Sequence, residues 1–349
     1  MSRPAYLGFA VQVLGREGLK SHDTRRWQGG PHLRVSLEHL RAVFAYLDET
    51  DIRLYRLASG LAPYATHPEH PQFHGQVEAC AVELAEVGAE ARRLGLRLSF
   101  HPSQYIVLNA PDEGLAARSA ADVEVQAAIL EAMGLDDEAV VVLHVGGAYG
   151  DPGAARERFA RVYEALSPVA RRRLVLENDD GRFGVGDVLW LHERIGTRAV
   201  FDVHHHHCYN PEGREAAEAA RACLATWQGW QARPKVHFSS PRTDWGYRHG
   251  SAAEPRAPNW VSHAEFADPF AFPAFYRSIA RPAAGLAPDV APDVVLEAKA
   301  KDVAVLQLRE DLRRYAPDVA AVFGLEGQIG NSPNESGTRS RANCQFARH

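Results

Sequence analysis

Short apolar runs rich in β-branched residues alternate with amphipathic helical stretches along most of the chain, and this alternation restricts the possible folds more than any other feature. Runs such as "AVVVLH" and "RLVLEN" are apolar without interruption, which is typical of strands buried on both faces. Eight strands are predicted, each followed by a helical stretch, so we expect a single (β/α)8 TIM barrel. The predicted strands are Tyr6–Gln12, Ile52–Ser59, Leu96–His101, Ala139–Gly146, Arg173–Asp179, Ala199–His204, Lys235–Ser239 and Asp293–Lys299.

Helical periodicity fills the intervals between these strands. The clearest stretches are Leu37–Leu47, Gln76–Leu94, Asp122–Met133, Ala154–Leu166 and Ala216–Trp227. We assign residues 1–326 to the barrel, with residues 242–260, rich in Gly, Pro and Arg, as a long inserted loop after the seventh strand. The polar residues 327–349 are predicted to be a disordered tail without a function.

Composition narrows the possible partners. The net charge is −5, so any nucleic-acid partner must be attracted by local rather than global positive charge. The four cysteines form no CxxC pair, which favours reduced thiols in a cytoplasmic protein. No apolar run is long enough to span a membrane, and we expect a monomer without a membrane partner.

Histidines and carboxylates gather where the predicted strands end, which is where a barrel of this kind builds its active site. The chain has 17 His and 44 Asp or Glu, too few for chance to explain one at six successive strand ends. The loop after the second strand adds His67. The six residues at the strand ends are His101, His144, Glu177, Asp202, His237 and Glu297.

Imidazoles together with carboxylates are ligands for Zn²⁺, Mn²⁺ or Fe²⁺. Their number exceeds what one tetrahedral ion needs, so two or three divalent ions are predicted, with a carboxylate such as Glu177 bridging. A cluster of this kind suits in-line hydrolysis of a phosphodiester.

The stretch "FDVHHHHCYN" places four histidines, His204 to His207, directly after Asp202 and well inside the chain. One interpretation is a histidine-rich surface loop. The other is that Asp202 and one or two of the histidines bind metal. Strand alternation would put His204 on the same side as Asp202.

Several motifs together resemble the ultraviolet damage endonucleases, the relatives of endonuclease IV among the TIM-barrel metalloenzymes. The most specific are "HPSQYIVLN" and "LENDD", and "LHVGGAYGD", "FDVHHHHCYNP", "KVHFSSPR", "SHAEFAD" and "LEAKAKD" also match. The resemblance extends from about Leu7 to Leu312, which is nearly the whole chain apart from its tail.

The resemblance implies a set of metal ligands. Because the family ligand lies three residues after the aspartate, His205 is preferred from the quartet, with His206 as the alternative. The ions expected are Mn²⁺, with Zn²⁺ as an option at one site. The implied ligands are His67, His101, His144, Glu177, Asp202, His205, His237, His263 and Glu297.

Catalytic roles are assigned to Glu177, His237 and Lys235. Lys235 shares a strand face with His237 and would reach the metals, unless it forms a salt bridge at the barrel mouth.

The resemblance also implies a probe that enters damaged DNA. Gln104 and Tyr105 would fill the gap left when two joined pyrimidines leave the stack, and Phe9 stands where the family often has a tyrosine. Gln12 or Val13 stands near a position where the family often has asparagine. Candidate phosphate contacts, which would otherwise be ordinary surface charges, are Arg25, Arg26, Arg182 and Arg242.

The implied activity is nicking of ultraviolet-damaged double-stranded DNA. The cut would lie immediately 5′ to a cyclobutane pyrimidine dimer or (6-4) photoproduct and leave a 3′-hydroxyl and a 5′-phosphate. Three alternatives stay open: an abasic-site endonuclease, a metal-dependent sugar isomerase or epimerase, and a barrel that binds damaged DNA without cutting it.

Overall fold

Eight parallel strands close into one barrel, in the order β1-β10-β7-β6-β5-β4-β3-β2. This computed structural model describes residues 3–244, 246–247, 255–280 and 291–326. All eight predicted barrel strands are present, although each is shorter than the apolar run that predicted it. Their bounds are β1 Leu7–Ala10, β2 Leu54–Arg56, β3 Arg97–Phe100, β4 Val140–His144, β5 Leu174–Glu177, β6 Arg198–Asp202, β7 Lys235–Phe238 and β10 Asp293–Leu296.

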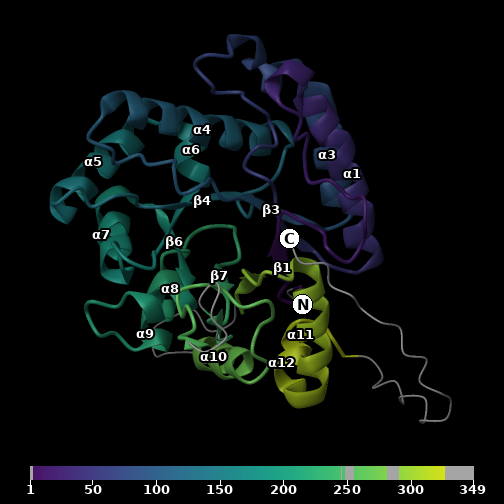
Figure 1. Cartoon of the computed structure of the whole chain (residues 1–349), viewed down its shortest axis with the longest axis vertical. Coiled ribbons are helices and arrows are strands. Elements are labelled where there is room, and N and C mark those ends of the chain that lie inside the picture. The colour runs from purple at the N-terminus through teal and green to yellow at the C-terminus, as the bar shows by residue number, and fades with distance from the viewer. Residues whose placement is uncertain (1–2, 245, 248–254, 281–290, 327–349) are drawn as a thin grey trace.

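Helices surround the ring of strands (Figure 1). The predicted stretch Gln76–Leu94 forms two helices, interrupted at Cys80, and the predicted Asp122–Met133 begins earlier because Asp112 caps a helix there. The helices are α1 Leu33–Glu49, α2 Gln76–Ala79, α3 Ala81–Arg93, α4 Glu113–Ala132, α5 Pro152–Ala165, α6 Pro168–Arg173, α7 Val185–Ile195, α8 Val203–Cys208, α9 Ala216–Ala225, α10 Ala271–Ala280, α11 Lys301–Tyr315 and α12 Pro317–Val322. Short 3₁₀ helices are η1 Trp27–Gly29 and η2 Pro71–Phe73.

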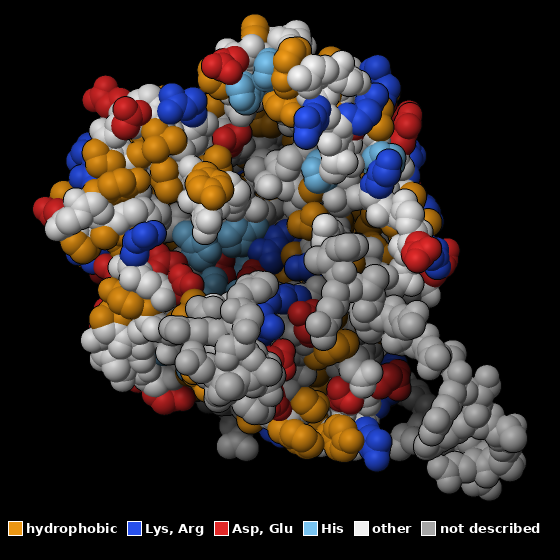
Figure 2. Space-filling view, in the orientation of Figure 1, with side chains coloured by type: hydrophobic (Ala, Val, Ile, Leu, Met, Phe, Trp, Pro, Cys, Tyr) orange, Lys and Arg blue, Asp and Glu red, His pale blue; other side chains and the backbone are white. Residues whose placement is uncertain are grey.

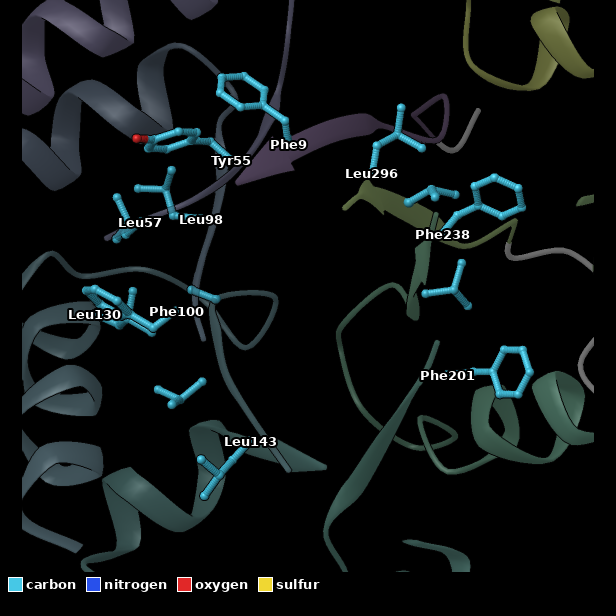
Figure 3. Close-up of a cluster of buried hydrophobic side chains, with 14 of the residues drawn as sticks. Phe9, Tyr55, Leu57, Leu98, Phe100, Leu130, Leu143, Phe201, Phe238 and Leu296 are labelled. Carbon is cyan, nitrogen blue, oxygen red and sulfur yellow. The ribbon is translucent and has the colours of Figure 1, made fainter. Parts of the chain in front are cut away.

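The apolar core has two parts because strand residues alternate between the two faces of the barrel wall. Outward-facing side chains such as Tyr55, Phe100 and Phe201 pack against the helices (Figure 3). Inside the barrel, a smaller cluster of valines with Trp227 fills the middle, namely Val140, Val142, Val175 and Val200. His144, Glu177 and Asp202 follow these valines on the same three strands, so they lie at the carboxyl end of the strands.

Phe9 belongs to the outer part of the core. Its side chain is fully buried, and its ring centroid lies 5.3 Å from that of Tyr55 in an edge-on contact. The prediction that Phe9 contacts the DNA lesion is therefore wrong. Alternation along β1 turns position 9 toward the helices, where it stabilises the fold by burial worth about 1.5–3 kcal/mol.

The loop after β7 is described only in part. Gly246–Tyr247 (β8) pairs antiparallel with Pro255–Arg256 (β9), while residue 245 and residues 248–254 of the predicted 242–260 insertion lie outside the described residues. The predicted tail 327–349 also lies outside them.

Two further predictions concern cysteines and membranes. Cys80, Cys208 and Cys223 are free thiols, and Cys344 lies outside the described residues. Across the described ranges, we find no helix with the length and apolar character needed to cross a membrane.

Candidate metal centre

Glu177 stands at the centre of the histidines and carboxylates that end the strands. Its Oε2 lies 2.8 Å from Nε2 of His101 and 3.6 Å from Nε2 of His144. Its Oε1 lies 2.7 Å from Nδ1 of His237. The carboxylate is fully buried, and its two oxygens serve different imidazoles, which is the arrangement expected of a bridging ligand.

Three ligand groups share members and so form one continuous cluster. Within each group, ligand atoms lie within 4.8 Å of one another. The first group is His101, Glu177, His237 and Glu297, the second is His144, Glu177 and His205, and the third is His205, His263 and Glu297. Figure 2 shows histidines gathered in a hollow of the molecular surface, with acidic and basic side chains beside them. The structure thus brings seven of the nine predicted ligands together.

Helix α8 explains which histidine of the quartet enters the cluster. It begins directly after β6, and the carboxylate of Asp202 caps it by accepting the backbone N–H of His205 at 2.8 Å. The chain is helical from Val203, so strand alternation does not apply to His204. One helical turn after the cap, His205 faces Glu177, with 3.6 Å between its Nδ1 and Oε1 of that carboxylate.

The other three histidines of the quartet have different surroundings. The ring of His204 is bonded through Nε2 to the carbonyl of Val261 at 2.9 Å, and that of His206 to the carbonyl of Arg214 at 3.0 Å. His207 is exposed. His206, the alternative ligand, is therefore directed away from the cluster.

Oxygen atoms outside the cluster fix the orientation of three candidate ligands. Nδ1 of His101 lies 3.0 Å from the carbonyl of Pro102, and Nδ1 of His205 lies 3.1 Å from the carbonyl of Asn178. Nδ1 of His263 lies 2.7 Å from Oγ of Ser239. Such contacts at Nδ1 turn Nε2 of each ring toward a metal, as in known metal sites, and Nε2 of His101 here contacts Oε2 of Glu177. The sequence motifs "HPSQ", "LEND" and "HFSS" contain these supporting residues, but only the fold shows what they do.

The charges within the cluster compensate one another. Burial alone would raise the pKa of Glu177, but the imidazoles of His237 and His144 outweigh it and hold that pKa well below its ordinary value. Burial would likewise lower the pKa of His205, but Asp202, Glu177 and Glu297 raise it to about 9. The pKa values of Glu177 and His205 are thus both shifted in the direction that favours the charged form.

Glu297 has a guanidinium partner that sequence reasoning missed. Nη2 of Arg56 donates to its Oε1 at 2.6 Å, and Nδ1 of His237 lies 3.2 Å from the same oxygen. Arg56 and His237 outweigh the effect of burial and hold the pKa of Glu297 far below its ordinary value. Arg56 stands three residues before the end of the predicted strand Ile52–Ser59, and that position is a signal by which it could have been found.

Several buried polar atoms in and around the cluster have no hydrogen-bond partner among the described residues. They are Nδ1 of His144, Nε2 of His237, Oδ2 of Asp202 and Nζ of Lys235. Buried polar atoms are rarely left unpaired unless a ligand satisfies them. Together with the mixed imidazole and carboxylate donors, these atoms fit divalent metal ions.

Lys235 lies two residues before His237 on the same strand and is fully buried. Burial, together with Arg97 and Arg56, holds its pKa well below the ordinary value. Within the part of the chain that the structure describes, Lys235 forms no salt bridge, so the alternative of a salt bridge at the barrel mouth is wrong.

Two predicted ligands do not join the three groups. His67 stacks on His70 with 4.5 Å between ring centroids, and its Nδ1 accepts the backbone N–H of Glu69 at 3.2 Å. Asp202 lies at the edge of the cluster, with Oδ1 at 3.9 Å from Nδ1 of His205, because this oxygen caps α8.

The predicted DNA-facing residues lie on exposed loops. Gln104 and Tyr105 follow β3, and the Tyr105 side chain is 75% exposed, the most of any large apolar side chain among the described residues. The predicted arginines, Arg25, Arg26, Arg182 and Arg242, are exposed. Arg25 is paired with Asp23 at 2.6 Å and Arg242 lies 3.6 Å from Asp244, whereas Arg26 and Arg182 have no ion pair among the described residues.

Comparisons with known proteins agree with this geometry. Residues 33–326 match the family model described as UV-endonuclease UvdE. A UV DNA damage endonuclease of Bacillus velezensis is 32% identical over 280 residues, covering 80% of this chain and 81% of that protein. One from Bacillus pumilus is 34% identical over 264 residues, covering 75% of each.

Solved structures show the same fold. The crystal structure of SacUVDE has a TM-score of 0.73 at 24% identity, covering 89% of this chain and 98% of that one. A xylose isomerase domain protein from Planctomyces limnophilus has a TM-score of 0.52 at 14% identity, covering 91% of this chain and all of that one. With the family model matched over most of the barrel and relatives above 30% identity, the chain belongs to the UV-endonuclease UvdE family.

Proposed function

We propose that this protein is a metal-dependent repair endonuclease that nicks duplex DNA immediately 5′ to ultraviolet photoproducts, leaving a 3′-hydroxyl and a 5′-phosphate. The observation that carries the proposal is the seven-residue cluster around Glu177 at the carboxyl end of the strands. The substrates would be cyclobutane pyrimidine dimers and (6-4) photoproducts in double-stranded DNA. The protein would act as a monomer on the DNA of the cytoplasm.

Two or three divalent ions would be held by the cluster, Mn²⁺ as the family resemblance implies, with Zn²⁺, which imidazole donors suit, as an option at one site. Such ions would activate water and neutralise the charge that develops on the phosphate oxygens. Glu177, whose two carboxylate oxygens contact different imidazoles, would be a ligand shared between ions. Asp202, with its unpaired Oδ2, and His67, after movement of its loop, would complete the ligand set.

The protein's own groups would orient the reacting strand and exclude water. His237 and Glu177, joined at 2.7 Å, form the buried floor of the centre, and Lys235 lies two residues before His237 on β7. A dry, fixed set of charges lowers the barrier without reorganisation during the reaction.

Lesion recognition would fall to Gln104 and Tyr105. An exposed ring on a loop beside the centre can fill the space left when linked pyrimidines leave the helix, and a lesion that is already unstacked costs less to extrude. Arg26, Arg182 and Arg242 would contact phosphates nearby.

The test is a nicking assay on supercoiled plasmid, irradiated or not, with Mn²⁺ and with EDTA as the metal-free control. Nicking confined to irradiated plasmid and absent in EDTA is expected. An end-labelled duplex with one dimer would then locate the cut, and sealing of the nick by DNA ligase would identify the ends.

Other outcomes would redirect the proposal. Cleavage of depurinated plasmid alone would indicate an abasic-site endonuclease. Binding of irradiated DNA without cleavage under any metal would indicate a pure binder. No interaction with any DNA would turn attention to sugar isomerisation.

A further inference from the structure

Lys301, the first residue of α11, occupies a position that is locally unfavourable in two ways. Its φ is +52°, in the left-handed region that residues with a Cβ avoid. It also places a cation at the amino end of a helix, where the helix dipole is positive. A residue that is unfavourable both in backbone conformation and in charge often has a functional role.

The turn that carries Lys301 is fixed from two sides. The backbone N–H groups of Lys299 and Ala300 donate to carbonyls of the 264–265 segment at 3.0 and 2.9 Å. On the other side, the buried carboxylate of Asp302 accepts the N–H of Leu14 at 2.7 Å. Strained backbone persists only where its surroundings enforce it, and such sites cluster near active centres.

The turn also lies at the edge of the metal centre. Lys301 follows the candidate ligand Glu297 by four residues, at the carboxyl end of β10. Burial and Arg56 lower the pKa of Lys301, and the opposite effects of Glu297 and Glu265 offset this only in part. Arg56 is already engaged by Glu297 at 2.6 Å. Within the described ranges, Lys301 itself forms no ion pair.

A part-buried ammonium without its own carboxylate, beside a second cation, is suited to an anion. Lysine acts as a point charge toward phosphate, whereas arginine prefers flat, two-pronged contacts. The chain has 39 basic residues but only four lysines, and two of them, Lys299 and Lys301, lie in this turn. We propose that Lys301 binds a phosphodiester group of the DNA strand at the edge of the metal centre, and that the strained turn holds its ammonium there.

This inference rests on the proposed function, because it names a contact to the same DNA. The experiment uses the full-length protein with Lys301→Ala, Lys301→Arg and Lys301→Gly variants. Affinity for an irradiated duplex is measured in EDTA, so that no cutting occurs, over a series of salt concentrations. Melting temperature is recorded for each protein.

Loss of one phosphate contact should reduce the slope of log K against log[salt] by about one for Lys301→Ala and Lys301→Gly. Lys301→Arg should restore most of the affinity. Lys301→Gly should also melt at a higher temperature than wild type, because glycine relieves the positive φ. Asp51→Gly is the matched control: Asp51 has a φ of +53° in the turn before β2, at the opposite end of the barrel, so DNA binding should not change.

Wild-type salt slopes in both Lys301→Ala and Lys301→Gly would overturn the inference while leaving the proposed function intact. If the wild-type protein bound no DNA at all, the proposed function and this inference would fail together.

Discussion

Charged residues are buried at both ends of the barrel, but the two ends differ in whether the protein itself provides hydrogen-bond partners for them. At the amino-terminal end, Oδ2 of Asp293 accepts hydrogen bonds from Arg97 at 2.6 Å and from Arg3 at 2.8 Å. Nearby, the Arg198 guanidinium donates to the carbonyl of Asp137 at 3.0 Å and lies 3.9 Å over the ring of Trp230. These groups are partnered by the protein itself.

At the carboxyl end, buried imidazole and carboxylate groups retain atoms without a partner among the described residues. Paired buried charges stabilise or specify the fold, whereas unpaired ones cost free energy that only a ligand can offset. The comparison therefore separates a structural end from a functional end, and each prediction below tests that separation.

The largest effect on activity is expected for Glu177→Gln. Removing the charge that serves His101, His144 and His237 should reduce nicking by about 10³-fold or more. Stability without metal should also fall, because His101 and His237 lose the buried carboxylate that they contact. The matched control is Glu138→Gln at the other end, which loses its pairing with Arg3 at 2.7 Å and should retain activity. Equal loss of nicking in the two variants would contradict the separation of the ends.

Asp293→Asn should have the largest effect on stability. It leaves the buried Arg97 without its carboxylate, which should lower the free energy of unfolding by about 3–5 kcal/mol. Urea denaturation measures this change, and calorimetry with Mn²⁺ should show nearly unchanged metal affinity. A variant that lost metal affinity but kept its stability would show that the two ends are not independent.

Acid should weaken the amino-terminal end. Burial raises the pKa of Asp293, but Arg97 and Arg3 outweigh it and bring the pKa below the ordinary value of 3.8. A depressed folded-state pKa gives stability that is present above the ordinary value and lost as pH falls through the folded one. Thermal melts between pH 7 and pH 2.5 should therefore show a larger loss for wild type than for Asp293→Asn, and parallel curves would argue against this role.

Ser239→Ala should have a smaller effect at the carboxyl end. Without the hydroxyl at 2.7 Å, the ring of His263 loses the contact that fixes its orientation. Mn²⁺ affinity should fall by about 10- to 100-fold, while stability changes little. Ser103→Ala, on the exposed loop after β3, is the control and should bind metal normally.

Tyr105→Ala should leave both ends intact and affect only DNA. Loss of a stacking ring should weaken binding of irradiated duplex by about 1–3 kcal/mol. Tyr315→Ala removes an aromatic ring that is 45% exposed at the end of α11, away from the metal centre, and should bind DNA like wild type. Fluorescence anisotropy measures the affinity of each variant for irradiated and for unirradiated duplex.

The sequence by itself determined the barrel and most of its chemistry. Uninterrupted apolar runs define strands buried on both faces, and parallel strands must bring their carboxyl ends together. From the strand ends alone, six residues are predicted to lie in one region, and the family resemblance adds His205 and His263. Of the six, Asp202 lies at the edge of the cluster and the other five within it: His101, His144, Glu177, His237 and Glu297.

The tertiary structure decided what depends on where each strand ends and what packs around it. The early start of α8 turns His205 rather than His204 into the cluster, and the register of β1 sends Phe9 into the outer core. The strain at Lys301 also arises from contacts distant in sequence, with the 264–265 segment and Leu14. His67, in contrast, is held outside the cluster by its near neighbours Glu69 and His70. Sequence periodicity predicts which residues lie on the same face of a strand or helix. Only tertiary packing determines where that strand or helix begins and ends and which residues contact it.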